Sequence, residues 1–176
     1  MITITRSKDR HTGDFGWLQA RWHFSFADYY DANNMGWGPL RVFNDDVIQG
    51  GKGFGLHGHK DMEIITYVLG GALERSDSKN NKGVLHPGEV QVMSAGRGIM
   101  HSEYNHLKDA PSSLLQIWIE PRTRGREPSY GQKPFDVAGQ PDRLVPLASG
   151  QGAEGAMTID ADATIYASRA STRSSD

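Results

Sequence analysis

Apolar residues along this chain come in short alternating or continuous runs, and residues that favour tight turns separate the runs. The runs lie within residues 1–7, 40–53, 53–71, 62–105 and 112–122, with turns at 70–71, 76–83 and 86–89. No segment has a sustained apolar period of 3.6 residues, so few helices are expected. The pattern predicts an all-β domain over residues 1–122.

Two other segments have different patterns. Residues 16–30 are rich in aromatics and fit either a strand or a loop packed on the sheets, with one or two rings at an entrance. Residues 123–155 are rich in Pro, Gly and charge, which predicts an irregular crossing segment. Residues 156–168 alternate again and predict one extra strand. The polar residues 169–176 cannot bury apolar surface, so we expect a disordered tail.

Composition narrows the chemistry. The 176 residues suit one domain, and the net charge of -2 offers nothing to attract nucleic acid or an anionic membrane. There is no cysteine, which excludes disulfides, thiolate catalysis and metal–thiolate sites. A metal would have to be held by histidines and carboxylates. No apolar run approaches the roughly 20 residues of a membrane span, and the N-terminus lacks the apolar core of a signal peptide, so we expect a cytoplasmic protein.

Two same-face pairs carry the candidate chemistry. Side chains at i and i+2 of a strand point the same way, so His57 and His59 project together, as do His101 and Glu103. If the two strands face one interior, three imidazoles and one carboxylate meet there. This ligand set suits one divalent transition metal with open positions for water or substrate. Without a metal, such a buried polar group would be costly.

The spacing of these residues resembles the cupin superfamily, whose fold is a jelly-roll β-barrel. Its first signature is matched by Gly51, His57, His59, Glu63 and Gly70, and the closing half of the second by Gly98, His101 and Asn105. Gly96 stands where the second signature has a proline. In the general cupin pattern Glu63 is the carboxylate ligand, and alternation from His59 also points Glu63 inward.

Beyond these signatures, the residue-by-residue sequence resembles the pirin family, the branch of the cupins that contains bacterial pirin-like quercetin 2,3-dioxygenases. The resemblance runs from about Gly16 to Arg122 and is densest in HGHKDMEIITYVLGG, VLHPGEVQVMSAGRGIMHSEYN and LLQIWIEP. It implies that His57, His59, His101 and Glu103 are the metal ligands, with Glu103 also catalytic. The family's metal is usually iron, while related dioxygenases accept copper, nickel or manganese. Glu63 would then either contact the ligand residues without binding the metal, or point outward after a bend in the strand.

Pirins usually carry two cupin barrels in a longer chain. Here residues 156–168 resemble the strand that opens the second barrel, so we expect a single barrel plus a C-terminal crossing strand. The surface that a second barrel would cover should then favour a homodimer or another partner.

The resemblance implies an oxidoreductase: a metal-dependent dioxygenase that cleaves the heterocycle of a flavonol such as quercetin with O2 and releases CO. The alternative is a non-enzymatic, redox-responsive pirin regulator that binds a transcription factor or a metabolic enzyme. A cupin that binds a small molecule or sugar without redox chemistry is a third interpretation.

Overall fold

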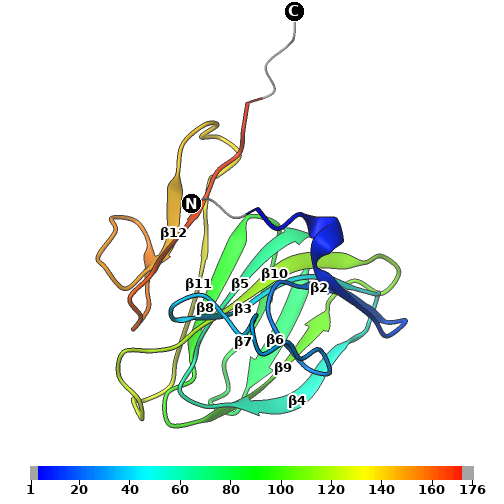
Figure 1. The fold of residues 1–176 in the computed structure, drawn as a ribbon, viewed down its shortest axis with the longest axis horizontal. Helices are drawn as coiled ribbons and strands as arrows, with labels where there is room; N and C mark the ends of the chain where they lie inside the picture. The colour runs from blue at the N-terminus through cyan, green and yellow to red at the C-terminus, as the bar shows by residue number, and fades with distance from the viewer. Residues whose placement is uncertain (1–3, 172–176) are drawn as a thin grey trace, which may run out of the picture.

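The computed structural model describes residues 4–171, and its regular structure is β-strand apart from one 3₁₀ turn, η1 (Ser7–Asp9) (Figure 1). Within this range no helix is long and apolar enough to cross a membrane. The predicted all-β class is confirmed. The first expected strand, over residues 1–7, does not form at residues 4–6, and its residues 1–3 lie outside the described range.

The largest element is a seven-stranded sheet, in which every neighbouring pair is antiparallel. In spatial order its strands are β1 (His11–Asp14), β2 (Leu18–Trp22), β3 (Leu40–Ile48), β10 (Ser112–Ile119), β5 (Glu63–Gly70), β8 (Glu89–Ser94) and β11 (Ser129–Pro134). The expected runs over 40–53, 62–71 and 112–122 therefore form the middle of this sheet.

A four-stranded sheet faces it. Its strands, in spatial order, are β4 (Gly53–His59), β9 (Ile99–Asn105), β6 (Leu73–Asp77) and β7 (Lys82–Leu85). Apolar side chains from both sheets meet between them, for example Val68 and Leu114 with Leu73 and Leu85. The two sheets form a sandwich whose interior also receives the polar residues described below.

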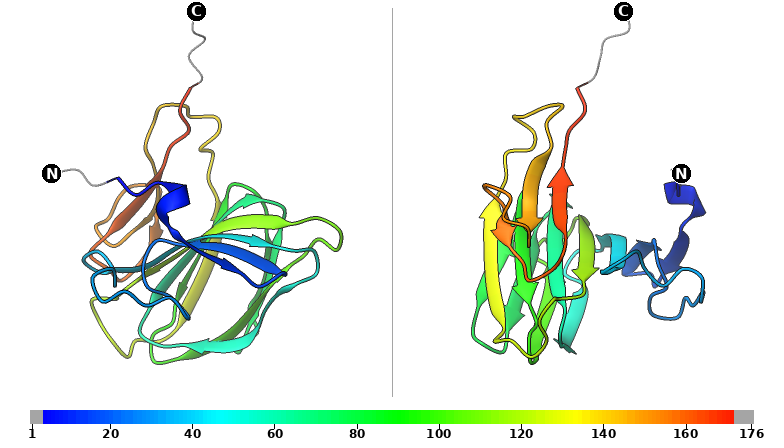
Figure 2. Two further views of the ribbon diagram at one scale, coloured as in Figure 1. Left: turned by 45° about the vertical axis from the view of Figure 1, so that its right-hand side comes forward. Right: turned by 60° about the vertical axis from the view of Figure 1, so that its left-hand side comes forward.

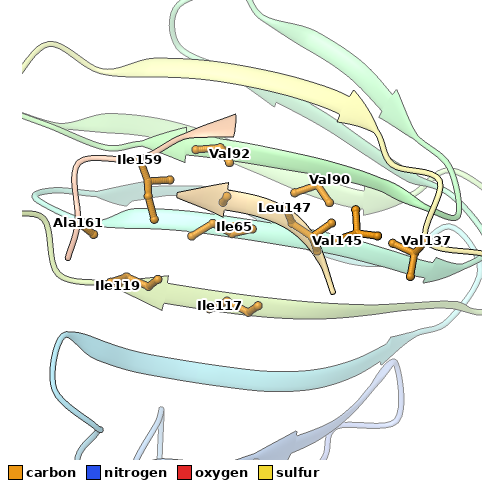
Figure 3. Close-up of a cluster of buried hydrophobic side chains, with 11 residues drawn as sticks. Ile65, Val90, Val92, Ile117, Ile119, Val137, Val145, Leu147, Ile159 and Ala161 are labelled. Atoms are coloured by element: carbon orange, nitrogen blue, oxygen red, sulfur yellow. The ribbon is translucent and has the colours of Figure 1, made fainter. Parts of the chain in front are cut away.

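A third layer covers the other face of the seven-stranded sheet. It contains the parallel pair β12 (Val145–Ser149) and β13 (Met157–Thr158), and β14 (Thr164–Ala167), which pairs antiparallel with β12. The orange and red strands of this sheet lie against one side of the sandwich (Figure 2). Figure 3 shows Leu147 and Ile159 among side chains that point toward Ile65, Val92 and Ile119.

This layer explains the continuous apolar runs of the central strands. In β5 the residues Glu63–Thr66 are buried in succession, and in β8 the residues Val90–Met93 are. Consecutive residues are buried because both faces of these strands are covered. The chain's own C-terminal strands thus cover this face of the seven-stranded sheet. The expectation of a homodimer or another partner stays a prediction.

The structure differs from the expectation after residue 122. The segment expected to be irregular, 123–155, contains β11 and β12. Strand β11 lacks apolar alternation because it is an exposed edge strand held by backbone pairing to β8. The extra strand expected at 156–168 is divided into β13 and β14. Of the expected tail, residues 172–176 lie outside the described range, while Ser171 donates to the Asp142 carboxylate.

Gly96, at the position of the cupin proline, has a structural reason to be glycine. Its φ of 48° lies in the left-handed region, which proline cannot adopt. A Cβ at this position would also collide with the carbonyl oxygen of Arg126. The turn before β9 therefore lies closer to the backbone at Arg126 than a proline at position 96 would permit.

Candidate metal centre

Strands β4 and β9 bring the two predicted pairs together. His57 lies directly opposite His101, and His59 lies opposite Ile99. Between Phe54 and His57 the register shifts, so that Gly55 and Leu56 face the single residue Ser102. This β-bulge lets Phe54 and His57, three residues apart, both line the interior while Leu56 is exposed.

The three imidazoles form a compact group. Their candidate ligand nitrogens all lie within 4.8 Å of one another, and the ring centroids are separated by 4.4 Å (His57 and His101) and 4.9 Å (His59 with each of the others). His101 is buried, and His57 and His59 are half-buried. The predicted histidine trio is thus assembled on one sheet at the mouth of the sandwich interior.

Burial favours the unprotonated form of His59 and His101, which is the form that binds a metal. Removal from water lowers the pKa of His59 to about 4 and that of His101 to about 3, with the neighbouring imidazoles acting in the same direction. His57 Nδ1 lies 2.7 Å from the carbonyl oxygen of Gly55, which can only accept, so Nδ1 carries a proton and Nε2 is the nitrogen left as the candidate metal ligand.

His101 tests whether a metal fits. Both of its ring nitrogens are buried, and neither has a hydrogen-bond partner in the part of the chain that the structure describes. Unpaired buried nitrogens are costly, and a metal ion would satisfy one of them. Three imidazoles in such a group suit a divalent transition metal.

Glu103 lines the same interior but belongs to a second polar cluster. Its carboxylate accepts hydrogen bonds from Gln91 Nε2 (2.5 Å) and Gln116 Nε2 (2.9 Å). Thr66 closes the ring, since its hydroxyl accepts from Gln91 (2.8 Å) and donates to Gln116 Oε1 (2.6 Å). Burial raises the pKa of Glu103, and these amides oppose that rise. Glu103 is not in the group of ligand atoms lying within 4.8 Å of one another, so its role as a ligand stays a prediction.

An ion pair lies beside His101 and Glu103. On β6, Asp77 is the cross-strand neighbour of His101, and Arg75 is that of Glu103. Arg75 Nη2 donates to Asp77 Oδ2 at 2.8 Å, and both side chains are completely buried. The guanidinium also lies 3.9 Å from the ring centroid of Tyr130.

The histidines open onto an apolar cavity of about 290 Å³. Its aromatic walls are Phe15, Trp17, Trp22, Phe26, Phe54 and Trp118. Trp118 stands edge-on to His59, with the ring centroids 4.8 Å apart. Three of the aromatics expected in 16–30 therefore reach the cavity. Such a space suits a flat aromatic molecule with one polar group at the histidines.

Glu63 points away from this site. It faces the third layer and accepts a hydrogen bond from Ser94 Oγ at 2.6 Å. Alternation from His59 fails because residues 60–62 leave the strand, with Asp61 at a φ of 48°. The alternation that pointed Glu63 inward was wrong for this reason, and in this structure Glu63 has no place beside the trio.

Several polar residues of the interior were missed by sequence reasoning. Gln91 and Gln116 supply the hydrogen bonds to Glu103, while Asn44 and Asp46 line the cavity. The signal was a lone polar residue within an apolar strand, as in EVQVM and LLQIWI. Polar residues in such a position need a buried partner or a ligand.

Comparison with known proteins agrees with this geometry. The pirin family model matches residues 5–119. The chain belongs to the pirin family. It is 52% identical over 153 residues to a pirin-like protein of Caulobacter vibrioides, covering 86% of this chain and 66% of that protein. It is 48% identical to the quercetin 2,3-dioxygenase of Escherichia coli K12, covering 94% of this chain and 71% of that one.

Solved pirin structures have the same fold. The bacterial pirin YhhW of Escherichia coli, in complex with nickel(II), superposes with a TM-score of 0.85 at 44% identity, over 92% of this chain and 68% of that one. The predicted cupin fold is confirmed, with its sheets facing each other rather than closing into one barrel. The pirin chain described here spans about two thirds of the length of these relatives.

Proposed function

We propose that this chain forms the metal-binding part of a dioxygenase that cleaves a flavonol-like heterocycle with O2. The observation that carries the proposal is the histidine trio, whose candidate ligand nitrogens lie within 4.8 Å of one another and which opens onto an aromatic cavity. The name of the Escherichia coli relative supports the substrate class. The identity of the metal stays open among iron, nickel, copper and manganese, because imidazole ligands suit all four.

Each group in the site has a task in this reaction. His57, His59 and His101 would hold the metal, and Glu103 is proposed as the fourth ligand. When bound, the metal supplies Lewis acidity and open positions for a substrate oxygen. The aromatic walls would hold the flat rings and exclude water.

Glu103 is also the candidate general base. Its carboxylate is buried, and its raised pKa makes it a better proton acceptor than an exposed glutamate. It would take the proton of the flavonol 3-hydroxyl, which makes the heterocycle electron-rich. Dioxygen then adds across C2 and C4, two ring bonds break, and C3 leaves as carbon monoxide, so that both oxygen atoms remain in the product.

The test starts with protein purified without chelators. Elemental analysis should find a stoichiometric transition metal, and quercetin should lose its visible absorbance in air. His57→Ala should lose both the metal and the bleaching, whereas His106→Ala, an exposed histidine at the end of β9, should lose neither. Glu103→Gln should bind the metal more weakly and, with metal added to saturation, should still lose turnover; unchanged turnover under these conditions would refute its role. A bound metal with no bleaching in the wild type would favour the non-enzymatic regulator.

A further inference from the structure

Two polar side chains on β3 face the cavity from the sheet opposite the histidines. Strand β3 alternates between buried and half-buried residues, and its buried set includes Asn44 and Asp46, only 2% and 3% exposed. Both line the same cavity as the histidine trio. The two sheets approach closely here, since Gln116, the β10 neighbour of Asn44, reaches Glu103.

One oxygen of each residue has no hydrogen-bond partner among the described residues. The Oδ1 atoms of Asn44 and Asp46 are buried, and within residues 4–171 neither has a hydrogen-bond partner. Gln116, beside Asn44 in the sheet, differs because its amide bonds both Thr66 and Glu103. A buried acceptor without a donor costs stability, so two of them in one cavity require an explanation.

The chemistry of the two atoms indicates what would satisfy them. Amide and carboxylate oxygens accept hydrogen bonds, so the missing partner is a donor. The walls around them are aromatic, including Trp22, the β2 neighbour of Asn44. A phenolic hydroxyl is a donor carried on a flat ring, and it matches both features.

The charge state of Asp46 is compatible with such a ligand. Burial raises its pKa to about 7, and the nearby carboxylates of Asp45 and Glu103 act in the same direction. Near neutral pH the group can therefore exist as a carboxylate that accepts or as an acid that also donates. A hydroxyl can satisfy either form.

We propose that Asn44 and Asp46 form a hydroxyl-recognition subsite, which selects substrates with a phenolic hydroxyl remote from the metal-binding group over the same ring system without one. The inference rests on the proposed function, because it assumes that the ligand's other end is held at the histidines. Asn44 and Asp46 thus determine specificity, whereas the trio and Glu103 perform the chemistry.

The test compares quercetin with 3-hydroxyflavone, which has the same ring system and 3-hydroxyl but no other hydroxyls. Isothermal titration calorimetry on metal-loaded protein without oxygen measures binding without turnover. Wild type should bind quercetin roughly tenfold or more tightly than 3-hydroxyflavone. Asn44→Leu and Asp46→Leu should each reduce that ratio to about threefold or less while 3-hydroxyflavone affinity changes little.

Two controls separate the subsite from a general disturbance. Asp46→Asn keeps an acceptor oxygen and should retain most of the preference. Asp45→Asn changes the adjacent acid on the other face of β3 and should leave the ratio unchanged. Equal loss of both ligands, an unchanged ratio in the leucine variants, or failure of both flavonols to bind would each overturn the proposal.

A second measurement distinguishes failure of the subsite proposal from failure of the dioxygenase proposal. Bleaching of quercetin in air is measured in parallel on the same proteins. A ratio that falls as expected, without any bleaching by wild type, would leave the subsite standing and remove the dioxygenase function. Bleaching with a ratio insensitive to Asn44 and Asp46 would do the reverse.

Discussion

Arg75 and Asp77 should differ sharply in the cost of their removal, although they form one ion pair. Both side chains are completely buried, 2.8 Å apart. Asp77 has three further donors, the backbone N–H groups of Lys79 and Asn81 and the Asn81 side-chain amide. Arg75 Nη2 also contacts Met93 Sδ at 3.6 Å and the guanidinium lies over Tyr130, but Nε and Nη1 have no hydrogen-bond partner among the described residues.

Arg75→Met removes the charge and the two nitrogens, Nε and Nη1, whose N–H groups have no partner among the described residues. It loses the hydrogen bond to Asp77 and the contact with Tyr130, the latter worth about 2 kcal/mol when desolvated. Relief of the unpaired donors returns roughly 1–3 kcal/mol each. Because Asp77 keeps its three other donors, we expect a net loss in the free energy of unfolding below about 2 kcal/mol.

Asp77→Asn should cost much more. It leaves the guanidinium of Arg75 buried without its hydrogen-bonded counter-charge and places an amide N–H₂ against two donors, Arg75 Nη2 and Asn81 Nδ2. Removal of one partner from a buried pair costs about 3–5 kcal/mol. The two variants should therefore differ by roughly 2 kcal/mol.

Urea denaturation of the metal-free proteins measures this difference, with equal m-values as the check on two-state unfolding. Lys79→Met, which breaks the exposed pair with Glu127, is the matched control and should change stability by less than about 0.5 kcal/mol. Arg75→Met as costly as Asp77→Asn would refute the reasoning. That result would mean that the buried positive charge of Arg75 itself stabilises the fold, through its interactions with Glu103 and Tyr130.

Three further predictions follow from the same interior. Gln116→Leu removes one of the two amides that hold Glu103, so metal affinity measured by chelator competition should fall about 10–100-fold; an unchanged affinity would argue against Glu103 as a ligand. Asp46 has a folded-state pKa of about 7, above its ordinary value of 3.8. The unfolded chain therefore loses this proton at a lower pH than the folded protein, and the free energy of unfolding falls as pH rises from about 3.8 to about 7. Metal-free Asp46→Asn should therefore gain up to roughly 4 kcal/mol relative to wild type between pH 4 and pH 8, and a difference independent of pH would disprove the shift. Leu147→Ala, in the third layer, should cost about 2–5 kcal/mol in thermal or urea unfolding; a loss under 1 kcal/mol would mean that β12 contributes little to the fold.

The sequence alone was sufficient for the strands of the sandwich between residues 40 and 119 and for the histidine trio, but not for β1 or β11. Both depend on a local rule, the two-residue alternation of a strand. His57 and His59 share a face whatever lies around them, and the same holds for His101 and Glu103. Their convergence required only that β4 and β9 be neighbours, which the spacing of the cupin signatures implied.

The same rule failed where the chain leaves a strand. Glu63 was expected on the face of His59, but the turn at 60–62 reset the alternation and turned Glu63 toward the third layer. The bulge at Gly55 and Leu56 is a second interruption, and it lets Phe54 and His57 share the cavity. An insertion of one residue in a strand moves every following side chain to the opposite face of the sheet. The apolar periodicity of the sequence does not reveal where such an insertion occurs.

Only the tertiary structure decided which distant residues meet. The ring of Glu103, Gln91, Thr66 and Gln116 joins four strands, and no local pattern links its members. The third layer likewise depends on contacts between residues beyond 136 and the outer face of β5, β8 and β10. Local pattern specifies which side of a strand is apolar or polar, whereas the partner on that side is set by the packing of the whole chain.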